Sequence, residues 1–210
     1  MISLFFAGLL GYLLGSFPAA YVFVLWKSKI DIRAAGSGNV GTLNSFEVTG
    51  SRLVGLAVLI IDLAKGFLTV VVAQAAFGAE FAVAAISGVA AVLGHNFPVW
   101  LRFKGGRGLA TGAGVMFAIA WQMVVVWLIC WGCGFAMSRG VNIANTVACL
   151  LTLLIILALP LTNAQGVMPT TLPSGEFSIF ALVFLGVILV KHFQPVREFI
   201  LEKRTKPAER

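Results

Sequence analysis

The chain has 210 residues, of which 60% are hydrophobic and 11% charged, and its formal net charge at pH 7 is +7. Soluble domains carry about 25% charged residues, so this composition excludes an ordinary soluble protein and predicts an integral membrane protein. All but Lys65 and Arg139 of the 15 lysine and arginine residues lie in three stretches, 27–52, 102–108 and 191–210. Because basic residues gather in cytoplasmic loops, this clustering explains the charge by topology and argues against nucleic-acid binding.

Apolar segments long enough to cross a bilayer follow one another along the chain. We expect spans at 2–26, 53–77, 81–101, 109–135, 141–160 and 177–191. Lys27 and Lys29 follow the first span and no positive charge precedes it, so we expect an uncleaved N-terminus outside the cell.

Six spans would leave the basic segment 191–210 on the outer side of the membrane, where the charge rule does not place it. We therefore expect a further crossing, either within 109–160 or through a break in 81–108. The predicted fold is an all-α polytopic membrane protein with seven transmembrane helices and a cytoplasmic C-terminus. It comprises a single membrane domain at 1–196 and a basic cytoplasmic tail at 197–210.

The first loop is rich in glycine and neutral polar residues, Gly36-Ser37-Gly38-Asn39-Val40-Gly41-Thr42-Leu43-Asn44. Gly36, Gly38 and Gly41 permit positive φ angles and a close approach of the backbone to a ligand. Successive amides in such a loop can form a concave anion site. The loop lacks the Gly-Lys-Ser/Thr ending of a Walker A motif. Its composition fits an anion-binding loop and a tight packing turn equally well.

The stretch from Gly94 to Thr111 combines a histidine, three cations and the glycines of a Phe-Lys-Gly-Gly-Arg-Gly turn. His95 has an unperturbed pKa of about 6.5, which suits proton transfer near neutral pH. Lys104 and Arg107 can neutralise phosphate oxygens. Topology at a membrane edge explains the cations but does not require the glycines, so we favour a functional role.

Two charged residues, Asp62 and Lys65, lie inside the second expected span at i and i+3, on one helical face. Intramembrane charges cost about 2.5–3.5 kcal/mol each on insertion scales and are functional candidates, although a mutually neutralising structural pair is equally compatible. The three cysteines lie in apolar runs and indicate helix packing. No cluster of His, Cys and carboxylates has metal-ligand spacing, so we expect no metal and no cofactor.

Together these residues resemble the bacterial acyl-phosphate:glycerol-3-phosphate acyltransferase family (PlsY). The likeness covers almost the whole chain and includes Gly15-Ser16-Phe17-Pro18, the loop 36–44, Asp62-Leu63-Ala64-Lys65-Gly66 and, most specifically, Gly94 to Thr111. The resemblance implies an enzyme that transfers a fatty acyl group from acyl phosphate to the 1-hydroxyl of glycerol 3-phosphate, giving lysophosphatidic acid and phosphate. It further implies a place in the bacterial plasma membrane, with the active site facing the cytoplasm.

The resemblance also implies the site. His95 and Lys104 are the expected catalytic residues, with His95 orienting or deprotonating the acceptor hydroxyl and Lys104 bridging both substrates. The expected substrate-binding residues are Ser37, Gly38, Asn39, Gly41, Asn44, Lys65, Gly105, Gly106, Arg107 and His192. The expected partners are the two substrates and membrane lipid. This mechanism requires loops 36–44 and 94–108 to meet on one side of the bilayer.

The chain departs from the family pattern at a few positions. Glu47 stands where the family usually has an arginine that grips the glycerol phosphate, and Leu43 stands where a threonine is usual. Pro195 replaces an asparagine, and Arg107 replaces a lysine. Three alternatives therefore remain: a family member with a changed acceptor, a member without activity, and a transporter of a small organic anion.

Overall fold

The protein is helical wherever the computed structural model describes regular structure. Residues 1–159 and 174–205 are described, the side chains of 174 and 202–205 excepted. The helices are α1 (Ile2–Gly15), α2 (Ala19–Ser28), α3 (Thr42–Thr49), α4 (Arg52–Phe77), α5 (Phe81–Asn96), α6 (Leu109–Ile119), α7 (Trp121–Ser138), α8 (Val141–Ala158), α9 (Ser174–Val190) and α10 (Phe193–Thr205), with 3-10 turns η1 (Ile32–Ala34) and η2 (Val99–Leu101). The chain divides into two compact units, Met1–Trp121 and Gln122–Arg210.

Within the described residues, several helical segments have the length and hydropathy of membrane spans. Five qualify singly: Ile2–Ser28, Arg52–Phe77, Phe81–Leu101, Trp121–Ser138 and Val141–Ala158. The pair Gly175–Val190 and Phe193–Leu201, bent by 50°, makes a sixth if it forms one span. These segments confirm the all-α membrane class, whereas the count of seven crossings and the orientation of the termini stay predictions.

The expected span 109–135 is wrong, because the helix breaks at Ala120 between α6 and α7. Ala120 takes an extended φ of −157°, which a helix cannot include. With 11 residues, α6 measures about 16 Å, too short to cross a hydrocarbon core of about 30 Å alone. The break falls in the stretch where the charge argument expects an additional crossing.

The first span is also interrupted rather than continuous over 2–26. Ser16 caps α1, and α2 begins at Ala19 after Pro18. Proline has no N–H to donate and disfavours the helical region for the residue before it, so the helix stops here. The interruption leaves the carbonyl of Phe17 outside the regular helical hydrogen-bond pattern, where it accepts from the amide of Ala19 two residues on, at 3.1 Å.

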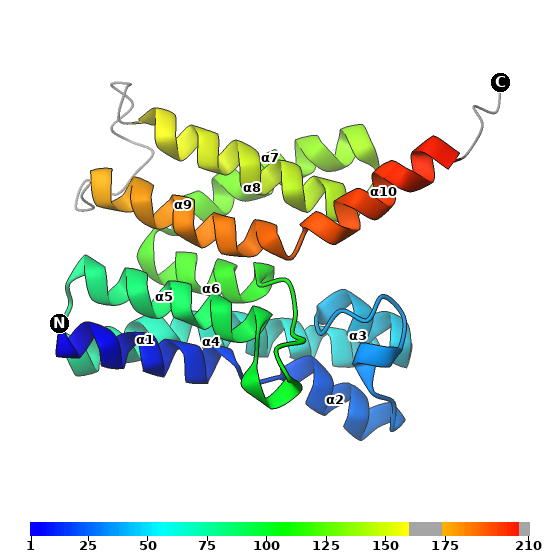
Figure 1. The fold of residues 1–210 in the computed structure, drawn as a ribbon, viewed down its shortest axis with the longest axis horizontal. Coiled ribbons are helices and arrows are strands. Elements are labelled where there is room, and N and C mark those ends of the chain that lie inside the picture. The colour runs from blue at the N-terminus through cyan, green and yellow to red at the C-terminus, as the bar shows by residue number, and fades with distance from the viewer. Residues whose placement is uncertain (160–173, 206–210) are drawn as a thin grey trace. The chain divides into compact units, whose positions relative to one another are not determined.

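In the first unit α1 lies along α5 (Figure 1) and α4 along α6, and glycine residues let both pairs pack closely. Gly11 and Gly15 of α1 lie against the backbone of α5, and Gly94 of α5 lies against the backbone of α1. Gly66 of α4 and Gly114 of α6 make a reciprocal contact of the same kind. A Cβ at any of these positions would collide with a carbonyl oxygen of the neighbouring helix. Small residues of this kind let transmembrane helices approach closely enough for backbone contact.

At one end of the first unit, α2 and α3 lie beside the segment that follows α5 (Figure 1). Val24, Ile32, Val40, Val58 and Leu101 form one buried apolar cluster there. The cluster includes a residue from each polar loop, Val40 and Leu101. The two loops are therefore held together by the same small core.

The second unit contains α7 to α10. Its α7 and α8 are joined by bonds from tryptophan: the Trp131 indole donates to Asn145 Oδ1 at 2.8 Å, and the Trp127 indole to Cys149 Sγ at 3.4 Å. Cys130 and Cys149 are buried and Cys133 is exposed, with no disulfide among them. The segment expected as a basic tail from 197 is helical through Thr205, as part of α10.

Candidate functional site

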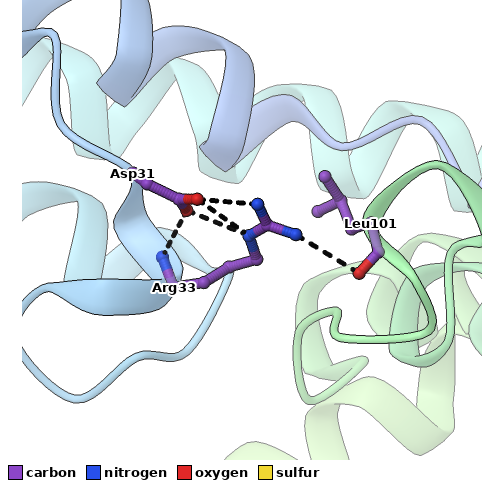
Figure 2. A network of polar contacts seen from close by, with 3 residues as sticks. All are labelled: Asp31, Arg33 and Leu101. Carbon is purple, nitrogen blue, oxygen red and sulfur yellow. Dashed lines mark hydrogen bonds and ion pairs between the residues drawn. The ribbon is translucent and has the colours of Figure 1, made fainter.

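The two glycine-rich loops meet in the first unit, and Arg33 joins them. Its guanidinium donates to both carboxylate oxygens of Asp31, the shortest of these bonds being 2.6 Å, and donates across to the Leu101 carbonyl at 3.4 Å (Figure 2). Arg33 lies just before the first loop and Leu101 lies within the second. The convergence that the proposed chemistry requires is therefore present in the structure.

The Asp31–Arg33 pair is electrostatically self-consistent. Hydrogen bonds from the Arg33 side chain and backbone hold the pKa of the Asp31 carboxyl below its usual value. In turn, the hydrogen-bonded Asp31 carboxylate raises the pKa of the Arg33 guanidinium. Both groups stay charged at neutral pH, so the ion pair holds the Arg33 side chain in the orientation in which it reaches the Leu101 carbonyl.

The first loop is organised by the side chain of Asn44, which is buried and 1% exposed. Its Oδ1 accepts from the Ser37 amide at 2.9 Å, and its Nδ2 faces three loop carbonyls within 2.9–3.3 Å, those of Asn39, Ala35 and Ile32. Every polar atom of the Asn44 amide is thus engaged by the loop itself. Its immediate role is to shape the loop, and a substrate contact for it stays a prediction.

The glycines of the first loop serve different purposes. Gly36 and Gly38 have φ angles of 56° and 68°, as the sequence predicts, because only glycine adopts this region without strain. The same expectation for Gly41 is wrong, since its φ is −155° and any residue adopts that extended conformation. Ser37 is exposed and Asn39 half-buried, so both lie where a ligand can reach them.

The second loop folds back onto the end of α5. The amides of Gly105 and Gly106 donate to the carbonyls of Asn96 and His95 at 3.3 and 3.0 Å. Gly108 has a φ of 84° and precedes the first residue of α6. Lys104 is exposed on this turn, whereas Arg107 is half-buried. The turn therefore presents one cation at the surface and holds the other closer to the protein.

A buried polar network lies beneath the loops. Asp62 Oδ1 is 2.8 Å from Lys65 Nζ and 3.5 Å from His95 Nδ1, and the Lys65 ammonium also donates to the Phe17 carbonyl at 2.9 Å. Asp62, Lys65 and His95 are 2%, 8% and 7% exposed. Lys65 is expected to bind substrate, but its ammonium is engaged by two protein oxygens, so a direct contact stays a prediction.

The inward direction of these charges follows from helix geometry. Val58, Asp62, Lys65, Thr69 and Ala73 recur at intervals of three and four residues and form the buried stripe of α4. The stripe faces other helices rather than lipid, where unpaired charge is unfavourable. The sequence predicts the shared face of Asp62 and Lys65, and the structure supplies their partners.

A small cavity opens onto this network. Its lining includes Ser16, Phe17, Val40, Asp62, Lys65 and His95. The Trp100 indole donates to Ser16 Oγ at 2.9 Å and the Tyr12 hydroxyl to the Phe97 carbonyl at 2.8 Å, so the end of α1 is tied to the second loop. Ser16 is not among the expected site residues, and Asp62 is expected only as a functional candidate beside Lys65, although both lie in motifs that carry the family resemblance.

The structure brings all the expected site residues of the first unit into the two loops and the network below them. His192 belongs to the second unit, where it is 1% exposed and its Nδ1 lies 2.9 Å from the Ile188 carbonyl. Its place in the substrate site stays a prediction. In the part of the chain that the structure describes, no three His, Cys, Asp or Glu residues are grouped to hold a metal ion.

The helical membrane fold and the paired polar loops define an integral membrane protein with converging glycine-rich, basic loops. The model of the family "Glycerol-3-phosphate acyltransferase" matches residues 5–201, and the chain belongs to this family. The expected family is thereby confirmed.

Relatives of that name match the chain over most of its length. The one from Cereibacter sphaeroides is 33% identical over 198 residues, covering 94% of this chain and 86% of the relative. The one from Endomicrobium trichonymphae is 36% identical over 199 residues, covering 93% and 91%. The crystal structure of PlsY (YgiH), an integral membrane glycerol 3-phosphate acyltransferase in its glycerol 3-phosphate form, is 29% identical with a TM-score of 0.78, covering 95% of this chain and 93% of that one.

Proposed function

We propose that this protein transfers a fatty acyl group from acyl phosphate to the 1-hydroxyl of glycerol 3-phosphate. The hydroxyl oxygen bonds to the acyl carbonyl carbon, the bond from that carbon to the phosphate oxygen breaks, and the hydroxyl proton leaves with phosphate or solvent. An acyl phosphate is already activated, so the protein needs only to hold two anions together and stabilise developing charge. The convergence of loops 36–44 and 94–108 is the observation that carries this proposal.

The proposed site uses backbone amides of the first loop and cations of the second. Gly36 and Gly38 give the first loop its tight course, and Ser37 and Asn39 border it at the surface. Lys104 is an exposed cation of the second loop and is proposed to bridge the two substrates. Arg107, half-buried on the same turn, adds positive charge behind it.

The proposed setting is a bacterial plasma membrane, with the site on the cytoplasmic face. The loops that form the site coincide with two of the three basic stretches, and such stretches collect in the cytoplasm. We propose seven crossings and a cytoplasmic α10, whose Arg197 lies next to anionic headgroups on that side. The acyl chains of donor and product remain in the lipid.

The decisive test supplies acyl phosphate, acyl-CoA and acyl carrier protein donors separately to purified protein, with glycerol 3-phosphate as acceptor. Lysophosphatidic acid from acyl phosphate alone supports the donor, the acceptor and the reaction together. Product from acyl-CoA alone would refute the proposal that acyl phosphate is the donor. Glycerol 3-phosphate flux in proteoliposomes without product would favour the transporter.

Glu47 supports a second candidate, the same chemistry with a changed acceptor. It is exposed on α3, which begins at Thr42 within the first loop, where a carboxylate repels the phosphate of glycerol 3-phosphate. In solvent such a repulsion amounts to about 1 kcal/mol, or roughly fivefold in affinity. We expect Glu47→Arg to lower the KM for glycerol 3-phosphate by at least that factor. A rise in KM would indicate that Glu47 recognises a different acceptor.

A further inference from the structure

Asp62 lies at the centre of a buried network that links α4 with α5, with the interruption of the first span and with the glycine turn. Asp62 lies on α4 with Lys65, whose ammonium also donates to the carbonyl at the interruption of the first span. The imidazole of His95, on α5, lies on the other side of the carboxylate at 3.5 Å. The backbone of the glycine turn lies against the imidazole, since a Cβ at Gly106 would collide with His95 Nε2, and the Gly106 amide donates to the His95 carbonyl at 3.0 Å.

Both edges of the His95 ring face protein. Nδ1 faces the Asp62 carboxylate, and Nε2 faces Gly106 so closely that a Cβ at that glycine would collide with it. The same Cβ would lie 2.6 Å from the Val40 carbonyl of the first loop. The ring is therefore wedged between α4 and the point where the two loops touch, with 7% of the residue exposed.

We propose that Asp62 is a positioning residue. It accepts a hydrogen bond from His95 Nδ1–H and fixes the plane of the ring. The ring in turn fixes the position of the turn formed by Gly105 to Gly108, which follows Lys104. In this arrangement His95 supports the anion-binding turn and is not the proton acceptor of the reaction. The inference rests on the proposed function and assigns a part of its site.

Lys65 neutralises the charge of the Asp62 carboxylate. A buried carboxylate without its ammonium, or the reverse, is strongly destabilising, whereas removing both charges together is frequently tolerated. A single substitution at Asp62 would therefore mix the loss of positioning with the loss of folding. Paired substitutions that remove both charges separate the two effects.

The test compares Asp62→Asn/Lys65→Met with Asp62→Leu/Lys65→Met. Both variants lack the two charges and have the same number of side-chain heavy atoms at position 62, and they differ in the acceptor oxygen that faces His95. Two measurements are made on each: kcat and KM for glycerol 3-phosphate with acyl phosphate, and amide hydrogen exchange of residues 103–110 without substrate. Glu80→Gln, an exposed acidic residue that precedes α5, is the control for purification and assay.

We expect the KM of Asp62→Leu/Lys65→Met to be about tenfold above that of Asp62→Asn/Lys65→Met, the factor of one hydrogen bond, with a smaller difference in kcat. Exchange in 103–110 should quicken in the leucine variant alone. Equal KM and equal exchange in the two variants would overturn the proposal.

A second pair keeps the test decisive if the leucine variant does not fold. In His95→Asn, the side-chain amide can still donate toward Asp62 from the position of Nδ1. In His95→Leu, the side chain has no donor. We expect His95→Asn to retain kcat within about tenfold and His95→Leu to release the turn in hydrogen exchange. A loss of kcat of about 10²-fold or more in His95→Asn, with unchanged exchange, would identify His95 as a general base and overturn the proposal. If wild type forms no product, the exchange data still decide the positioning role while the proposed function fails.

Discussion

Removing the Asn44 side chain tests how the first loop is held. In Asn44→Ala, the Ser37 amide loses its acceptor, and the carbonyls of Ala35 and Asn39 lose their donor inside a buried site. One net hydrogen bond contributes about 1 kcal/mol and an unsatisfied buried group costs about 1–3 kcal/mol, so we expect a loss of about 3 kcal/mol. In a chain of this size that lowers Tm by about 6–12 °C.

Asn44→Asp sharpens the test because it preserves shape. Its Oδ1 still accepts from Ser37, but its second oxygen faces the loop carbonyls that Nδ2 serves, so it should unfold at least as early as Asn44→Ala. The assay is thermal unfolding of purified protein, with hydrogen exchange of residues 36–41 as a local measurement. Asn39→Ala, a half-buried asparagine of the same loop, is the control. If Asn44→Asp matched wild type in Tm and in exchange, the account of the loop would be refuted.

Three further predictions concern the second loop and its surroundings. Gly106→Ala should lose at least about 2 kcal/mol, as an overpacked core does, whereas Gly132→Ala, with nothing within 4 Å of the added Cβ, should be neutral or gain up to about 1 kcal/mol in unfolding measurements. Lys104→Ala should lower kcat/KM at least about 30-fold, because a hydrogen bond from a charged group is lost. The control Lys27→Ala, at the end of α2, should change kcat/KM less than about twofold. Equal activities in the two variants would show that Lys104 is not part of the site. Because Arg33 lowers the pKa of Asp31, the pairing stabilises the protein above about pH 4 and this contribution is lost as the pH falls below that value. Wild type should therefore have a higher Tm than Asp31→Asn at pH 7, by a margin corresponding to less than about 1 kcal/mol, and the margin should shrink on acidification.

Hydropathy and charge predict most of the fold, because long apolar runs and basic loops are local signals. The breaks are harder to predict. Pro18 gives a local signal for the interruption of the first span, and an expected continuous helix over 2–26 overlooks it. The break at Ala120 has no such signal, since alanine is a strong helix former. Tertiary context overrides propensity there.

In the candidate site, too, features with a local sequence signal are predictable and those that depend on tertiary contacts are not. Glycine content predicts the positive φ angles at Gly36 and Gly38. It does not distinguish Gly106, whose role is close approach to His95 and depends on a contact between segments. The carbonyl that accepts from Lys65 belongs to Phe17, 48 residues away in the sequence. The sequence alone does not show that these two residues are in contact. Sequence therefore identifies which residues are polar in an apolar setting, and structure identifies which of them are already engaged by protein.

The interruption at Ser16–Pro18 has a consequence for how the protein enters the bilayer. A continuous helix would direct the Phe17 carbonyl to an amide four residues on, and the ammonium on α4 would then have the Asp62 carboxylate as its nearest counterpart on its own helix. Ribosomes make the N-terminal segment first, so this carbonyl is already within the membrane when the charged helix arrives. The interruption at Pro18 thus supplies the Lys65 ammonium with an acceptor from a segment that is synthesised before α4.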